Sequence, residues 1–204
     1  MALEDGLFVA VEGIDGCGKT TVIDSLLPEL RRAGIVPTIT REPADNAVGQ
    51  LLRQLSRIGE LEPMTAALLS SAARHSEKGV LRATLRSGNL LIADRYYLSG
   101  LAYHAADGIT FHTYASMNRD VPKPDLYLWL EVSEEVALAR KPMRADRWEA
   151  PKFSSAVHRS YPLAVSYVEK NDKTRVIRVD ANQAVKEVVR CVRDELLRLL
   201  DNWR

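Results

Sequence analysis

The sequence predicts an α/β fold in which a five-stranded parallel sheet carries helices on both faces. Five short apolar runs alternate with longer segments of helical periodicity, and each run is nearly continuously apolar. Strands of that kind are buried on both faces, as in parallel sheets that are covered by their crossover helices. A length of 204 residues and a hydrophobic content of 46% suit one domain over residues 1–204.

The first predicted strand, Leu7–Val11, leads directly into a glycine-rich loop and then into a helix. Residues 13–20 read Gly-Ile-Asp-Gly-Cys-Gly-Lys-Thr, which fits the pattern GxxxxGK(S/T) in full. Apolar residues then recur every three or four positions from Val22 to Ala33, and Gly34 follows as a helix stop. Pro28 is expected to kink this helix, because its ring removes one backbone hydrogen bond.

The remaining elements continue the alternation of strand and helix. Further strands are predicted at Ile35–Thr40, Leu90–Ala93, Leu126–Val132 and Val176–Val179. Helices are predicted at 47–55, 65–85 and 185–199, together with one that begins at about 134 and another that ends at about 170. Ligands of parallel sheets bind outside the carboxyl ends of the strands. Five polar residues follow closely on predicted strands and are therefore expected along one edge: Asp15, Arg41, Glu42, Asp94 and Arg95.

The glycine-rich loop has the chemistry of a phosphate-binding site. Its glycines let the backbone wrap so that N–H groups point inward, and the dipole of the following helix adds positive charge there. Lys19 would reach the β and γ phosphates of a nucleoside triphosphate, and the Thr20 hydroxyl would join the shell of a bound Mg²⁺. The residues predicted to bind ATP are Gly13, Ile14, Asp15, Gly16, Cys17, Gly18, Lys19, Thr20 and Thr21.

Arginines near the strand ends favour a kinase over other proteins with this loop. The chain has no Asn-Lys-x-Asp sequence of the kind that reads guanine, since residues 171–173 have its composition but not its order. Phosphoryl transfer between two nucleotides needs cations on both sides of the transferred group. Arg95 can bind an acceptor phosphate bidentately, and Arg74, on the inward side of a helix, could bind it too.

Three further arginines, Arg140, Arg144 and Arg147, lie in a short segment that Pro142 interrupts. This arrangement is consistent with a mobile lid, at about residues 140–150, that closes over the donor nucleotide. For each of them the alternative is a solvated, charged helix end.

A series of motifs spans almost the whole chain. They are 8–21, Thr40–Pro43, Leu68–Leu69 through Arg74–His75, Asp94–Tyr96, Ser99, Ala102–Tyr103, Pro124–Leu126, Asp146–Arg147 and Asp180–Ala181. In this order and spacing the chain resembles the thymidylate kinases. The resemblance implies the P-loop nucleoside monophosphate kinase fold and an ATP-dependent transferase that phosphorylates dTMP to dTDP for dTTP synthesis, with Mg²⁺ as cofactor.

The same resemblance implies roles for individual residues. Asp15 would hydrogen-bond the 3′-hydroxyl of the acceptor sugar, and Tyr103 would lie beneath the sugar and exclude a 2′-hydroxyl. Arg74 and Arg95 resemble the acceptor-phosphate and base-side arginines. Asp94 would orient Mg²⁺-bound water or the acceptor phosphate, and Thr20 would help to hold the metal. The full acceptor set is Asp15, Glu42, Ser70, Arg74, Arg95, Gly100 and Tyr103. The alternatives are core packing for Tyr103 and helix-surface charge for Arg74.

The catalytic residues that the resemblance implies are Lys19, Asp15, Arg95 and one arginine of the lid. Some family members carry an arginine between the two glycines of the loop, which this chain lacks. The catalytic arginine should therefore come from the lid, with Arg144 as the first choice and Arg140 and Arg147 as the alternates.

Two departures from the family pattern leave the acceptor base open. The family usually has Leu-Leu-Phe before the arginine, with the ring stacked on thymine, whereas this chain has Leu68-Leu69-Ser70. Loss of that ring removes stacking worth on the order of 1 kcal/mol. Residues 43–46 also replace the usual glycine-rich continuation. The alternatives are a kinase of the same fold for another deoxynucleotide, or for several, and a non-catalytic ATP-binding module.

Composition and termini predict a cytoplasmic protein that binds neither nucleic acid nor membrane. Twenty-eight basic and twenty-seven acidic residues give a net charge of +1, which argues against a polyanion-binding surface. Residues 1–6 do not resemble a signal peptide, and no run approaches 18 apolar residues. Two cysteines suit a reducing compartment. The family resemblance implies a homodimer.

Overall fold

The fold is built on a five-stranded parallel sheet with the strand order β2-β3-β1-β4-β5. The computed structural model describes residues 6–59, 61–140 and 151–203. The strands are β1 Leu7–Glu12, β2 Thr38–Arg41, β3 Leu90–Asp94, β4 Leu126–Glu131 and β5 Arg175–Asp180. The predicted five-stranded parallel sheet is therefore confirmed.

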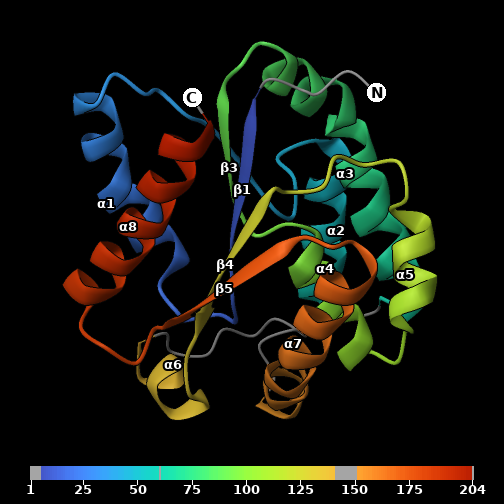
Figure 1. The fold of residues 1–204 in the computed structure, drawn as a ribbon. Coiled ribbons are helices and arrows are strands. Elements are labelled where there is room, and N and C mark those ends of the chain that lie inside the picture. Colours follow the sequence, from blue (N-terminus) through green and yellow to red (C-terminus); the bar gives the residue numbers. More distant parts are fainter. Residues whose placement is uncertain (1–5, 60, 141–150, 204) are drawn as a thin grey trace.

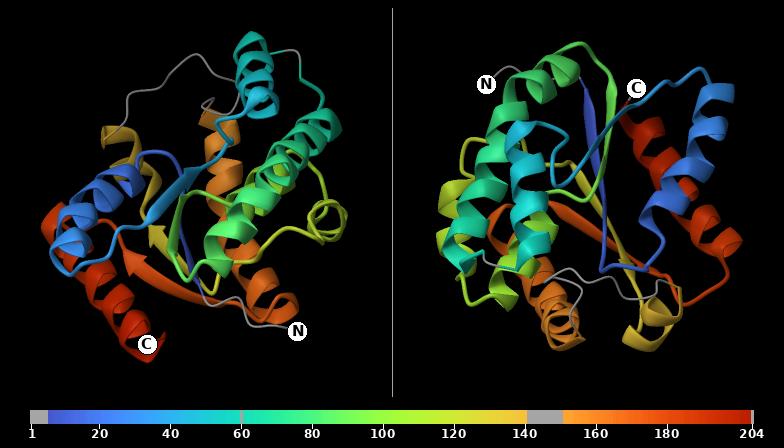
Figure 2. Two further views of the ribbon diagram at one scale, coloured as in Figure 1. Left: turned by 90° about the horizontal axis from the view of Figure 1, so that it is seen from above. Right: turned by 180° about the vertical axis from the view of Figure 1, so that it is seen from behind.

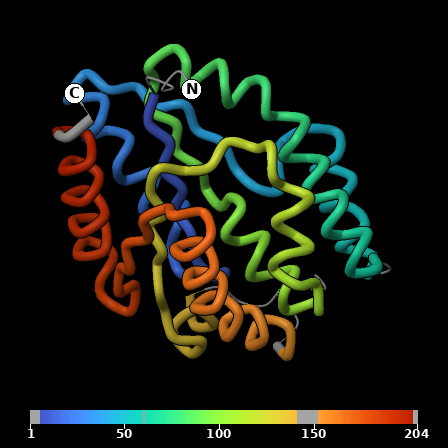
Figure 3. Tube along the Cα trace, turned by 45° about the vertical axis from the view of Figure 1, so that its right-hand side comes forward, coloured from blue at the N-terminus to red at the C-terminus, as the bar shows by residue number. Residues whose placement is uncertain are grey.

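Helices cover both faces of this sheet (Figure 1). They are α1 Lys19–Arg32, α2 Ala47–Ile58, α3 Pro63–Arg86, α4 Tyr97–Ala106, α5 Phe111–Met117, α6 Glu134–Arg140, α7 Pro151–Asn171 and α8 Val185–Trp203. Helices α1 and α8 pack together on one face (Figures 1 and 3), and α3, α4 and α7 lie on the other (Figure 2). No helix in the described ranges is long and apolar enough to cross a membrane.

The central strand β1 is buried along its entire length, and β3 and β4 flank it. The edge strands β2 and β5 are partly exposed, and Ile39 of β2 keeps 38% of its surface. The expected burial on both faces thus holds for the inner strands and not for the edges, where one side lacks a neighbouring strand. The position of β1 places the loop that follows it at the middle of the sheet's carboxyl edge.

Helices α4 and α5 are two elements that the sequence pattern did not predict. All six residues from Tyr97 to Ala102 are buried, so the first part of α4 has no polar face and shows no helical periodicity. Helix α5 is only seven residues long, which is too short to establish a period. Both helices follow β3 and, as shown below, both contribute to the site.

A buried carboxyl group, that of Glu12, lies at the end of β1. Glu12 has no exposed surface, and its Oε1 accepts hydrogen bonds from the backbone N–H groups of Tyr96, at 2.9 Å, and Ser99, at 3.2 Å. Its Oε2 accepts a hydrogen bond from the Ser99 hydroxyl. These N–H groups begin α4, so the carboxyl group satisfies donors that the helix leaves unpaired. Burial raises the pKa of Glu12 to about 7.

The raised pKa of Glu12 predicts a pH dependence of stability. The folded protein binds the proton with a pKa of about 7, and the unfolded chain binds it with the ordinary value of 4.5. Between these values the folded state holds more protons, so the free energy of unfolding falls as the pH rises, by at most about 3 kcal/mol in total. Glu12→Gln does not titrate, so we expect urea unfolding of this variant to lack that loss.

Glu131→Gln, at the exposed end of β4, is the matched control and should follow the wild-type pH profile. If the difference in unfolding free energy between wild type and E12Q stays constant from pH 4.5 to pH 7, Glu12 does not carry the proton.

Candidate active site

The loop between β1 and α1 has a backbone conformation that requires glycine. Gly13 and Gly16 adopt φ angles of 142° and 82°, in the region that side chains disfavour. A Cβ atom at Gly13 would lie 2.6 Å from the Leu130 carbonyl oxygen, and one at Gly16 would lie 2.3 Å from that of Ala137. The loop therefore packs closely against β4 and α6.

Lys19, the first residue of α1, folds back over this loop. Its Nζ atom donates hydrogen bonds to the carbonyl oxygens of Gly13, at 3.1 Å, and Ile14, at 2.9 Å. Burial lowers the pKa of the ammonium group, and the positive charge of Arg95 lowers it further. The ammonium group and the N-terminus of a 14-residue helix thus place positive charge at one point, which suits an anionic phosphate.

A cavity of about 770 Å³ extends from this loop along the carboxyl edge of the sheet. It is lined by residues 15–22, Arg41, Glu42, Asp94, Arg95, Arg140, Gln183, Val185 and Val188. All five polar residues that were expected to gather at this edge line the cavity. Its volume is in the range of small-molecule sites. Arg41, for which the sequence indicates no specific role, adds a further cation to the cavity.

Two oxygen-bearing side chains meet beside Lys19. The Thr20 hydroxyl donates a hydrogen bond to Asp94 Oδ2 at 2.7 Å, and both residues line the cavity. These are the residues predicted to hold Mg²⁺, and hard oxygen ligands are the type that this ion prefers. Among the described residues no group of three His, Cys, Asp or Glu side chains could hold a metal by itself.

Asp15, Arg95 and Tyr103 form one contact cluster beside the loop. Arg95 Nη2 donates to Asp15 Oδ1 at 2.8 Å, and the Tyr103 hydroxyl donates to Asp15 Oδ2 at 3.3 Å. The Arg95 guanidinium group lies over the Tyr103 ring at 5.2 Å from its centroid. Arg95 Nη1 also donates to the Gly13 carbonyl oxygen at 2.7 Å, so the cluster is joined to the phosphate-binding loop.

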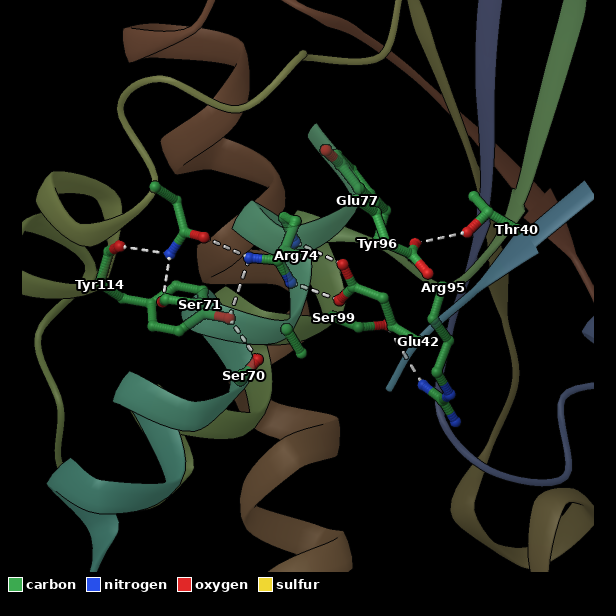
Figure 4. A network of polar contacts seen from close by, with 12 residues as sticks. Thr40, Glu42, Ser70, Ser71, Arg74, Glu77, Arg95, Tyr96, Ser99 and Tyr114 are labelled. Atoms are coloured by element: carbon green, nitrogen blue, oxygen red, sulfur yellow. Dashed lines mark hydrogen bonds and ion pairs between the residues drawn. The ribbon is translucent and has the colours of Figure 1, made fainter. Parts of the chain in front are cut away.

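Arg74 is fixed deeper in the molecule, between β2 and α5 (Figure 4). Its Nε and Nη2 atoms donate to the two carboxylate oxygens of Glu42, and its Nη1 atom donates to Asn118 Oδ1 at 2.5 Å and to the Tyr114 hydroxyl at 3.2 Å. Arg74 is 1% exposed, which excludes the alternative of helix-surface charge. Burial alone would lower the pKa of the guanidinium group, but the Glu42 carboxylate raises it above the ordinary value.

Comparison with known proteins identifies the family. The thymidylate kinase family model matches residues 11–192. A probable thymidylate kinase from Archaeoglobus fulgidus is 34% identical over 202 residues, which cover 96% of this chain and 99% of that protein. The thymidylate kinase from Alkalilimnicola ehrlichii is 33% identical over 214 residues, covering 97% and 95%. The chain belongs to the thymidylate kinase family.

A solved structure gives the same result for the fold. The thymidylate kinase from Candida albicans superimposes with a TM-score of 0.78 at 24% identity, covering 98% of this chain and 94% of that one. This likeness confirms the predicted P-loop nucleoside monophosphate kinase fold.

Ser70 and Gly100 both lie against Tyr114. The sequence predicts that these two residues bind the acceptor nucleotide. The Ser70 hydroxyl shares a hydrogen bond with the Tyr114 hydroxyl at 2.8 Å (Figure 4). A Cβ atom at Gly100 would lie 2.2 Å from the same hydroxyl and 2.6 Å from two ring carbons. Tyr114 thus occupies space that small residues on α3 and α4 leave open.

Only one of the three lid arginines lies in the described part of the chain. Arg140, at the end of α6, donates from Nη1 to the Ala181 carbonyl oxygen at 2.7 Å and from Nη2 to that of Gln183 at 3.2 Å. It therefore lines the end of the cavity where α8 begins. Arg144 and Arg147 lie outside the described residues.

Sequence reasoning missed three residues that hold the site together. Tyr114 and Asn118 bind Arg74, and the Tyr161 hydroxyl on α7 donates to the Gly13 carbonyl oxygen at 3.0 Å. None of the three follows a predicted strand or belongs to a recognised motif, so only the packing of α5 and α7 reveals them.

The close approach at Gly100 predicts a large effect of one methyl group. Gly100→Ala would force Tyr114 or α4 to move, and we expect a loss of about 1–3 kcal/mol of unfolding free energy in urea. Gly79→Ala is the matched control, because it also lies in a helix but a Cβ there meets nothing within 4 Å. That variant should be more stable by roughly 0.5–1 kcal/mol. Equal changes in the two variants would contradict the packing described here.

Proposed function

We propose that this chain is an ATP-dependent dTMP kinase, which transfers the γ-phosphoryl group of ATP to dTMP and releases ADP and dTDP for dTTP synthesis. The observation that carries the proposal is the cavity in which Asp15 and Lys19 of the phosphate-binding loop lie together with Arg95, in a chain of the thymidylate kinase family. We assign the activity to one kinase domain over residues 1–204.

On the donor side, Lys19 and the N–H groups of residues 13–21 bind the phosphates of ATP. The Lys19 ammonium group is held over the loop by hydrogen bonds to the carbonyl oxygens of Gly13 and Ile14 and to the Cys17 Sγ atom, so it is desolvated and close to the place where phosphate oxygens would bind. A cation in this setting interacts far more strongly with transferred charge than it would in water.

The residues at the metal position fit Mg²⁺. Thr20 and Asp94 offer one hydroxyl and one carboxylate, and this ion takes few protein ligands because it keeps water and substrate phosphates in its shell. When bound, Mg²⁺ neutralises charge on the phosphate oxygens. Asp94 and Thr20 would hold it at the end of β3, beside the loop.

On the acceptor side, Asp15 binds the 3′-hydroxyl of dTMP, Arg95 binds its phosphate and Tyr103 lies under the sugar. The contacts among these three residues support the assignment, because they bring a carboxylate, a guanidinium group and a ring face to one place. Glu42, Ser70, Arg74 and Gly100 form the base end. A module that only binds ATP would not need Arg95 at the loop. The similarity to proteins named thymidylate kinases supports dTMP as the acceptor rather than another nucleotide.

We place the arginine that stabilises the transition state in the lid, with Arg144 as the first choice and Arg140 and Arg147 as alternates. Arg140 is bonded to two carbonyl groups near the start of α8, which favours a role in holding the donor end of the cavity.

We also propose that the protein is a cytoplasmic homodimer. Helices α2 and α3 expose the apolar side chains of Leu51, Ile58, Met64 and Leu68, each by more than 40%. Apolar side chains gathered on neighbouring helices favour a protein interface. Both cysteines are free, which suits a reducing compartment. Sedimentation equilibrium tests the dimer, which requires twice the chain mass of 22.8 kDa.

The lid assignment predicts different kinetics for two arginine variants. Arg144→Ala should lower kcat by about 10³-fold or more with the Kd for ATP unchanged, because a group that acts only in the transition state does not stabilise bound ATP. Arg140→Ala should instead raise the KM for ATP. A loss confined to ATP affinity in R144A would move the catalytic role to Arg140 or Arg147.

The proposed function is tested by a coupled assay of ADP release. We expect dTMP to give the highest kcat/KM among dTMP, dUMP, dGMP, dCMP, dAMP and UMP at equal concentration, and chelation of Mg²⁺ to abolish turnover. A preference for another base would overturn the dTMP assignment. Binding of ATP without transfer to any of the six would indicate a non-catalytic module.

A further inference from the structure

Tyr114 connects Ser70 to Arg74, although it belongs to neither the phosphate-binding loop nor a family motif. It lies on α5 with no exposed surface, and its hydroxyl is within hydrogen-bond distance of both residues (Figure 4). Ser70 and Arg74 are four residues apart on α3 and therefore share one face of that helix. These two positions form the base end of the acceptor site under the proposed function.

The chemistry of the three groups fixes the direction of the hydrogen bond between Arg74 and Tyr114. A guanidinium group only donates, so the Tyr114 oxygen accepts from Arg74 and keeps its own proton to donate. The Ser70 oxygen, 2.8 Å away, is in reach of that proton, and either hydroxyl can donate in this contact; our inference takes Tyr114 as the donor. Ser70, which is half-buried, then has its own proton left to donate to a further group. The order Arg74 to Tyr114 to Ser70 therefore orients the serine hydroxyl.

The ring of Tyr114 is held so that its hydroxyl cannot leave this position. It stacks on the Tyr97 ring with centroids 6.1 Å apart and contacts the His104 ring at 4.7 Å. Gly100 leaves the space for the hydroxyl end of the ring. Asn118, at the end of the same helix, accepts from Arg74 and donates to the Tyr114 carbonyl oxygen at 2.8 Å. Helix α5 thus fixes Arg74 on the side away from Glu42.

We propose that Tyr114 is a positioning residue for the acceptor base. Its hydroxyl fixes Arg74 and aims the Ser70 hydroxyl, so that the base is bound at position 70 through a polar group rather than a stacked ring. This inference rests on the proposed function. It identifies the feature of this chain that takes the place of the missing phenylalanine.

The test compares Tyr114→Phe, Ser70→Ala and the double variant by steady-state kinetics. Tyr114→Phe keeps the buried ring and removes only the hydroxyl, so the fold is retained. We expect it to raise the KM for dTMP about five- to tenfold, the effect of one neutral hydrogen bond, with kcat and the KM for ATP unchanged within about twofold. Ser70→Ala should act in the same direction. The double variant should be no worse than the larger single change, because both break the same connection.

Tyr127→Phe is the matched control. Tyr127 is also fully buried, on β4, and its hydroxyl has no hydrogen-bond partner among the described residues, so its removal should leave every kinetic constant unchanged.

Each other outcome overturns a stated part of the inference. Additive effects of the two changes, or an unchanged KM for dTMP in S70A, would show that Tyr114 does not act through Ser70. Equal losses for ATP and dTMP in Y114F would make its role structural. If the wild-type protein does not phosphorylate dTMP, the proposed function fails and this inference fails with it, whereas wild-type turnover with unaffected variants removes the inference alone.

Discussion

The carbonyl oxygen of Gly13 joins the parts of this protein. It accepts hydrogen bonds from Lys19 on α1, from Arg95 after β3 and from Tyr161 on α7. A single backbone group at the end of the central strand thereby fixes the relative positions of the glycine-rich loop, of Arg95 with its partners Asp15 and Tyr103, and of a helix that is distant in sequence. Because glycine is required at this point, the convergence depends on a backbone conformation as much as on charge.

Two groups of buried polar side chains lie near the Gly13 carbonyl oxygen, one around Glu12 and one around Arg74. Glu12 accepts hydrogen bonds from the first residues of α4 and so fixes the position of Ser99. The Ser99 hydroxyl in turn accepts a hydrogen bond from Arg95 at 3.2 Å. In the second group, Glu42, Asn118 and Tyr114 enclose Arg74. Each buried charge in these groups has a partner, which is the condition under which burial of charge is tolerated. The side chains that line the site are therefore held in place by buried polar groups such as Glu12, Tyr114 and Asn118.

The parts of the fold that follow from local pattern could be predicted from the sequence. The loop motif, the inner strands and the gathering of Asp15, Glu42 and Asp94 at one edge depend on periodicity and on the geometry of parallel sheets. Helix α4 could not be predicted in this way, because its first six residues are all buried and leave no polar face. Tyr114 and Asn118 contact Arg74 from more than 35 residues away along the chain, and no local pattern reports such a contact.

The close approach of Tyr114 to Ser70 and Gly100 has a consequence for how this site can change over evolutionary time. A bulkier side chain at position 70 that followed the direction of the serine hydroxyl would collide with the tyrosine. A ring in that direction would therefore require a smaller residue at position 114. Positions 70, 100 and 114 are therefore coupled by packing, so the effect of a substitution at one of them depends on the residues at the other two.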